Sequence, residues 1–328
     1  MINLNTTYLG LSLKSPFIVG SSGLTGSVAN IIDFEKQGAG AVVLKSLFEE
    51  QILNEVQYTM KQSDLNYQYP EAFDYISNYS HSNGIDNYLK LIKDSKRAVA
   101  IPVIASINCA TAGQWMKYAQ RIQEAGADAL ELNIFVLPSD PERTAAQNEK
   151  VYFDVLAGVL KYVSIPVAIK LSSHFSGLAE TTRRLSWSGA KGIVMFNRFY
   201  SPDIDIEHFK LSATHIFSTS DEIYQPLRWV ALMSDLVQCD IAATTGVHDA
   251  SGMIKLLLAG AKAVEVVSAI YQNGHGFIAE VLAGLQSWME AHSFEKPSDF
   301  IGKMSHKNAG NPVAYERVQF MKHFAGIE

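Results

Sequence analysis

The chain has 328 residues, of which 48% are hydrophobic and 18% are charged, and its formal net charge is −6. Size alone suggests about two domains, although barrels of alternating strands and helices reach this length as one domain. The acidic balance and the absence of a Lys/Arg run argue against nucleic acid or an anionic membrane as a partner. Cys109 and Cys239 form neither a metal spacing nor a disulfide framework, so we expect no metal site and a reducing, cytoplasmic location.

The N-terminal stretch MINLNTTYLG has neither a positively charged region nor an apolar region of the kind found in signal peptides. No apolar run in the chain is long enough to span a bilayer. We therefore expect no membrane partner.

Short apolar runs alternate with helical patterns from one end of the chain to the other. The runs that we interpret as strands are residues 17–21, 41–46, 102–108, 129–135, 166–171, 192–197, 239–245 and 263–269. The stretches with helical periodicity are residues 27–37, 112–125, 145–162, 177–188, 226–236, 249–258 and 274–291. Near-continuous apolar strands that alternate with helices indicate a parallel sheet covered by helices.

Four junctions between a helix and the next strand repeat the dipeptide Gly-Ala. They are KQGAGAVV (36–43), EAGADALEL (124–132), WSGAKGIV (187–194) and LAGAKAVEV (258–266). A glycine at the end of a helix accepts a left-handed backbone, which short helix-to-strand loops favour. The repeat predicts an α/β fold, a single (β/α)₈ TIM barrel spanning residues 1–328 as one domain. A doubly wound open sheet is the alternative.

Two long segments interrupt the repeat, residues 47–85 after strand 2 and residues 198–225 after strand 6. Both would lie at the C-terminal face of the barrel, where barrel active sites are built. Long insertions at such places are usually lids or binding loops. We expect the tail from residue 293 onward to form one or two capping helices.

Polar residues end most of the predicted strands, so a site is expected where these ends converge. They are GSSG (20–23), Lys45, Ser46, Ser106, Asn108, Asn133, Lys170, Asn197, TTG (244–246) and Ser268. Each of them alone is ordinary, because a strand-end Asn is as often a turn former as a ligand. Glu131 alternates with Asn133 and should face the interior, where Lys170 is its expected partner.

The last two strand ends indicate a phosphate. The stretches ATTGVHDAS (243–251) and VVSAIYQNG (266–274) follow strands seven and eight, whose loops often bind phosphate in barrels. Two lysines and several amides beside such a corner suit flavin mononucleotide (FMN), and a lysine at the flavin N1–C2=O edge would stabilise the reduced ring. No GxGxxG follows a strand, which argues against a Rossmann dinucleotide site.

The sequence resembles the dihydroorotate dehydrogenase family of FMN-dependent (β/α)₈ barrels. The stretches that carry the resemblance are LGLSLKSPFIVGSSG, GAGAVVLKS, PVIASI, GADALELN, IPVAIKLS, QPLRWVALM and TTGVHDASGMIKLLLAGAKAVEVVSA. The class 1 branch is the most similar, because no membrane-associating extension precedes the matching region. The resemblance implies a homodimer, and it leaves any redox partner unspecified.

The resemblance also implies roles for individual residues. Lys45 and Asn133 match catalytic positions between flavin and substrate, and Asn197, Asn78 and Ser139 correspond to substrate-binding positions. The residues expected to bind the cofactor are Ser21, Ser22, Gly23, Lys45, Ser46, Asn108, Asn133, Lys170, Thr245, Gly246, Val247, Val267 and Ser268.

The family's catalytic base is a Cys or Ser in the loop after Asn133, and this chain departs from that pattern. The position falls on Val136 or Leu137, neither of which accepts a proton. The residues that could replace the base are Ser139, Asp140, His81 and His174.

These observations predict an FMN-dependent oxidoreductase that transfers hydride between a CH–CH group and flavin N5. Its substrate is expected to be small and planar, and to have diverged from dihydroorotate because the base is missing. One alternative is a catalytically inactive flavin-binding homologue that acts as an electron carrier. The other is a phosphate-binding barrel enzyme without a flavin.

Overall fold

The computed structural model describes residues 2–48, 70–108, 112–199, 202–212 and 216–316, with side chains from residue 84 onward in the helix that begins at Pro70. Eight parallel strands form a closed barrel, since β6 pairs both with β7 and with β4. Around the barrel they follow the order β4 (Ala41–Val43), β3 (Phe17–Val19), β13 (Ala263–Val266), β12 (Asp240–Thr244), β9 (Gly192–Met195), β8 (Val167–Leu171), β7 (Ala129–Asn133) and β6 (Val103–Asn108). The predicted (β/α)₈ barrel is confirmed, and the open sheet is wrong.

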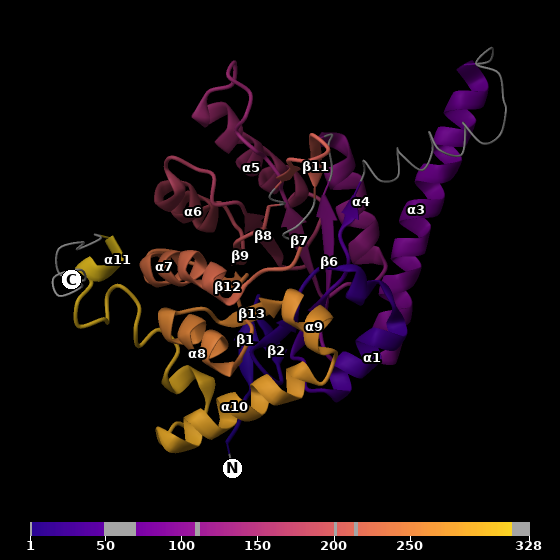
Figure 1. Ribbon diagram of the computed structural model, residues 1–328. Helices are drawn as coiled ribbons and strands as arrows, with labels where there is room; N and C mark the ends of the chain where they lie inside the picture. The colour runs from indigo at the N-terminus through magenta and orange to yellow at the C-terminus, as the bar shows by residue number, and fades with distance from the viewer. Residues whose placement is uncertain (1, 49–69, 109–111, 200–201, 213–215, 317–328) are drawn as a thin grey trace.

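Helices surround the strands on the outside of the barrel (Figure 1). They are α1 (Val28–Lys36), α3 (Pro70–Ala98), α4 (Ala112–Glu124), α5 (Ala145–Val159), α6 (Leu178–Trp187), α7 (Tyr224–Met233), α8 (Ala250–Ala259), α9 (Ser268–Asn273) and α10 (Phe277–Ala291). The predicted Gly-Ala junctions have the expected geometry: their first glycines, Gly38, Gly126, Gly189 and Gly260, have φ of 103°, 96°, 102° and 121°. A side chain would strain each of these four turns.

A short hairpin that was not predicted from the sequence closes the N-terminal end of the barrel. It consists of β1 (Thr6–Tyr8) and β2 (Leu11–Leu13), which pair antiparallel. Its buried Tyr8, Leu9 and Leu13 pack against small residues inside the barrel: Ala41, Ala129, Ala168, Ala242 and Ala263. Small side chains at these positions leave room for the hairpin, so the half of the barrel at the N-terminal ends of the strands is a filled apolar core.

The two insertions contain more regular structure than the sequence predicted. Helix α3 begins at Pro70, inside the predicted insertion 47–85, and β5 (Leu47–Phe48) extends the sheet beside β6; residues 49–69 lie outside the described part. The second insertion contains an antiparallel hairpin, β10 (Asp203–Asp205) and β11 (Lys210–Ser212), and the 3₁₀ helix η2 (Ser220–Ile223).

The C-terminal tail was predicted to form one or two capping helices, and its residues from 317 onward lie outside the described part. Up to residue 316 it contains one 3₁₀ turn, η3 (Pro297–Asp299), and one four-residue helix, α11 (Val313–Glu316). Within the described ranges, no helix is both long enough and apolar enough to cross a membrane.

Candidate active site

A layer of polar side chains lies directly above the apolar floor of the barrel. Glu131, Lys170 and Glu265 each follow an interior alanine by two residues, and alternate residues of a strand share a face. All three are buried. Because a buried charge is costly unless it is paired, these side chains must neutralise one another.

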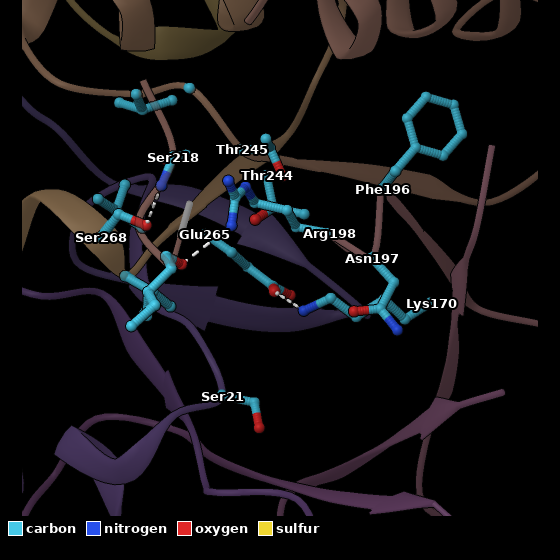
Figure 2. Close-up of a pocket in the computed structure, with 15 residues that line it drawn as sticks. Ser21, Lys170, Phe196, Asn197, Arg198, Ser218, Thr244, Thr245, Glu265 and Ser268 are labelled. Atoms are coloured by element: carbon cyan, nitrogen blue, oxygen red, sulfur yellow. Dashed lines mark hydrogen bonds and ion pairs between the residues drawn. The ribbon is translucent and has the colours of Figure 1, made fainter. Parts of the chain in front are cut away.

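Lys170 lies between the two glutamates. Its Nζ is 2.8 Å from Glu265 Oε2 and 3.6 Å from Glu131 Oε1. Figure 2 shows the Lys170 ammonium group directed at the Glu265 carboxylate. The predicted contact with Glu131 is therefore present, but Glu265 is the nearer partner. Glu265 was not predicted as a site residue, although an acid within the apolar run AVEVV was a signal for it.

Burial and charge shift the pKa values of this cluster strongly. Burial, reinforced by the charge of Glu265, raises the pKa of Glu131 to about 8, and Lys170 only partly opposes this. Burial alone would lower the pKa of Lys170, but the two carboxylates outweigh it and raise that pKa. Lys170 therefore stays charged at neutral pH, whereas Glu131 retains a proton.

A chain of hydroxyl groups connects the acidic cluster with the strand ends. Ser106 Oγ donates to Glu131 Oε1 at 3.2 Å and lies 2.7 Å from Ser46 Oγ. Ser46 Oγ lies 3.1 Å from Ser21 Oγ, which also accepts the backbone N–H of Ser46 at 2.9 Å. Ser106 is fixed by Tyr88, whose hydroxyl exchanges hydrogen bonds with its backbone. Side chains from five separate segments of the chain thus form one network.

Two amides extend this network toward the rim. Asn197 Nδ2 donates to Asn133 Oδ1 at 2.8 Å, and Asn133 Nδ2 lies 3.5 Å from Ser46 Oγ. Lys45 is exposed beside Ser46, while Asn108 ends β6 and is half-buried. The structure brings Asn133, Asn197 and Ser46 together as predicted and places Lys45 on the same rim.

The turn after β12 borders a cavity of about 210 Å³. Thr245 and Gly246 have φ of 83° and 78°, so two successive residues are left-handed. A Cβ at Gly246 would lie 2.2 Å from the backbone N of Ile223, which makes glycine necessary there. The cavity is lined mainly by the predicted residues Ser21, Lys170, Asn197, Thr245, Gly246, Val247, Val267 and Ser268.

Arg198 lines the same cavity and fixes a neighbouring segment. Its guanidinium contacts both carboxylate oxygens of Glu222, at 2.7 Å and 3.2 Å, and donates to the carbonyls of Ile216 and Phe217. Ser218, from the same segment, donates its backbone N–H to Ser268 Oγ at 3.0 Å. Arg198 therefore holds the segment 216–222 against the end of β9.

The loop after β7 is apolar and partly exposed. Phe135 stacks on Phe199 with ring centroids 4.1 Å apart. Val136 packs against the core, whereas Leu137 is 50% exposed and borders a second cavity of about 740 Å³ that Asn197 also lines. Of the two candidates for the missing base, Leu137 is thus the one that faces the same cavity as Asn197.

Of the residues considered as substitutes for the base, His174 lines the same cavity as Leu137 and Asn197. Ser139, Asp140 and His174 are exposed, and His174 packs edge-on against Phe199 at 4.6 Å. The side chains of His81 and of the predicted substrate residue Asn78 lie outside the described part of the structure.

Comparisons with known proteins agree with this architecture. The family model for dihydroorotate dehydrogenase matches residues 3–289. The chain is 25% identical to the catalytic subunit of dihydroorotate dehydrogenase B (NAD(+)) from Thermoplasma acidophilum, over 92% of this chain and 99% of that protein. It is 26% identical to a putative dihydroorotate dehydrogenase A (fumarate) from Aeropyrum pernix, over 91% and 96%, respectively. The chain therefore belongs to the dihydroorotate dehydrogenase family of flavoprotein oxidoreductases.

Proposed function

We propose that this protein is an FMN-dependent oxidoreductase that transfers hydride between a CH–CH group of a small planar substrate and the flavin. The observation that carries the proposal is the convergence of Lys170, Asn133, Asn197 and Ser46 at the C-terminal end of the barrel, beside the tight turn at Gly246. Barrel enzymes build their active sites at this end.

The residues present fit FMN. The turn at Thr245 and Gly246 and the hydroxyl of Ser268 border the cavity on the side where barrels bind phosphate. Lys170 and Asn133 supply donors deeper in the barrel, as the carbonyls and nitrogens of a flavin ring require. Two buried oxygens, Ser22 Oγ and Glu265 Oε1, have no hydrogen-bond partner among the described residues. A polar ligand would offer them one.

When bound, the flavin would supply a two-electron hydride acceptor at N5. Lys170 would hold the pyrimidine edge of the ring, and Asn133 and Asn197, already joined at 2.8 Å, would orient ring and substrate together. Lys45 would provide a positive charge on the substrate side, because it is exposed at the rim.

The apolar side chain of Leu137 supports a substrate other than dihydroorotate. Oxidation of dihydroorotate requires removal of a proton from carbon as well as hydride transfer, and Leu137 cannot accept that proton. The cavity beside it has an aromatic and apolar side formed by Phe196, Phe199 and Tyr224. A substrate whose proton exchanges directly with water would need no base at this position.

The visible spectrum of the purified protein, followed by anaerobic addition of dihydroorotate, tests the proposal. We expect a yellow protein with flavin bands that dihydroorotate bleaches slowly or not at all. Rapid bleaching would contradict the altered substrate while preserving the flavoenzyme, and a colourless protein that takes up no FMN would contradict the proposal itself.

The second candidate is a flavin-binding electron carrier without turnover, which the apolar Leu137 also favours. Leu137→Cys tests it, with Val136→Cys as the matched control, because Val136 packs into the core instead of lining the cavity of Asn197. If the site remains an enzyme site, Leu137→Cys alone should bleach with dihydroorotate at least about tenfold faster than the parent. No gain in either variant would favour the carrier over an enzyme that acts on dihydroorotate.

A further inference from the structure

Two buried carboxyl groups share a single lysine inside the barrel. The side chains of Glu131 and Glu265 are each 1% exposed, and that of Lys170 is 10% exposed. Glu265 reaches Lys170 across the interior, because β9 and β12 lie between β8 and β13 in the sheet. One ammonium group balances one carboxylate, so a second ionised carboxyl would leave an unbalanced buried charge.

In the part of the chain that the structure describes, the groups that face the pair include no second cation to balance it. Tyr8 faces it from β1 and Tyr88 from α3, and burial raises the pKa of both phenols, which therefore remain neutral. Asp240, near Tyr8, adds negative charge. Arg198 lines the same cavity as Glu265, but its guanidinium is bound by Glu222.

The local geometry therefore favours one retained proton. Glu265 Oε1 has no hydrogen-bond partner among the described residues. Glu131 Oε1 accepts a hydrogen bond from Ser106, and burial, reinforced by the charge of the neighbouring Glu265, raises the pKa of Glu131 to about 8. Carboxyls that interact this strongly titrate as a pair.

A route for a proton leads from this pair to the cavity. Ser106 Oγ joins Glu131 to Ser46, and Ser46 joins Ser21, which lines the cavity. Each hydroxyl can accept one hydrogen bond while donating another. The successive oxygen–oxygen distances are 3.2, 2.7 and 3.1 Å.

We propose that the Glu131–Glu265 pair is a redox-linked proton store: at alkaline pH, where the pair has lost its shared proton, it takes up one proton when the flavin is reduced and releases it on reoxidation. The inference rests on the proposed flavin site. Hydride from the substrate brings two electrons and one proton to the ring. The negative charge that results beside Lys170 competes with the carboxylates for that cation. An O–H bond then forms at a glutamate oxygen with a proton from water, and it breaks when the electrons leave.

The midpoint potential of bound FMN, measured from pH 6 to 9, tests this inference. In the unmodified protein, the midpoint potential should fall more steeply with increasing pH above neutral pH. The steeper slope should correspond to about one additional proton taken up per two electrons. Glu265→Gln should lose this additional proton, because a single carboxylate paired with Lys170 stays ionised. Glu280→Gln, which changes an exposed glutamate on α10, should keep it.

Glu131→Gln provides a second test, since removing either member abolishes the pair. Both variants should show the same shallower dependence of potential on pH. The inference would be overturned if the midpoint potential fell equally steeply with pH in the unmodified protein and in whichever of the two variants binds FMN. The proposal that the protein binds a flavin would then still stand. A colourless protein that binds no FMN would end the proposed function and this inference with it.

Discussion

Replacing Glu131 by Gln should make the stability of the protein less dependent on pH between 6 and 8. Burial and the neighbouring Glu265 raise the pKa of Glu131 from 4.5 to about 8 in the folded state. The folded protein thus holds a proton that the unfolded chain releases above pH 4.5. The resulting stability is fully present below pH 4.5 and is lost as the pH rises through 8.

The size of the effect follows from that shift. Each pH unit over which the folded state alone binds the proton changes the free energy of unfolding by about 1.4 kcal/mol. Allowing for half-protonation at pH 8, the unmodified protein should lose about 2 kcal/mol between pH 6 and 8 from this group. Lys170 does not contribute in this range, because its raised pKa keeps it charged.

Urea unfolding of the FMN-free protein at pH 6, 7 and 8, followed by tryptophan fluorescence, measures the effect. Glu131→Gln should lose about 2 kcal/mol less stability over this range than the unmodified protein, whereas Glu280→Gln should behave as the unmodified protein does. An equally steep loss of stability in Glu131→Gln would refute the assignment of the proton to this carboxyl.

Two further predictions concern the walls of the smaller cavity. Gly246→Ala should weaken FMN binding at least about tenfold, because its Cβ would meet the backbone of Ile223 at 2.2 Å. Gly10→Ala, at φ 75° with open space around it, should leave the affinity for FMN unchanged. Equal affinities in the two variants would contradict the role of this turn. Arg198→Met should speed amide hydrogen exchange in residues 216–222 at least about tenfold, since it removes the contacts to Glu222 and to two carbonyls. The control is Arg228→Met, which changes an exposed arginine. Exchange as slow in Arg198→Met as in this control would contradict the role of Arg198.

The sequence was sufficient to predict the repeated architecture and the rim of the site. Each apolar strand followed by a helix, with a glycine such as Gly126 or Gly260 at the junction, is a pattern that can be recognised locally in the sequence. The closed barrel is built by repeating this unit. Asn133 and Lys170 were predicted to lie on the same rim because neighbouring parallel strands end at the same edge, and the register pairs these two residues.

Contacts across the barrel could not be predicted in the same way. Glu265 lies 95 residues from Lys170, and only closure of the sheet brings the two together. The N-terminal hairpin has two three-residue strands, too short for an alternating pattern to be recognised. Its position follows instead from the small interior side chains, such as Ala129 and Ala168, that make space for Tyr8.

Titration of FMN into the purified, flavin-free protein tests the central claim most directly. Our account predicts saturable binding of one FMN per chain, visible as a shift of the flavin absorption bands, with an affinity that falls at least about tenfold in Lys170→Met. Absence of binding, or an affinity that does not change when Lys170 is replaced, would contradict the placement of a flavin in this barrel.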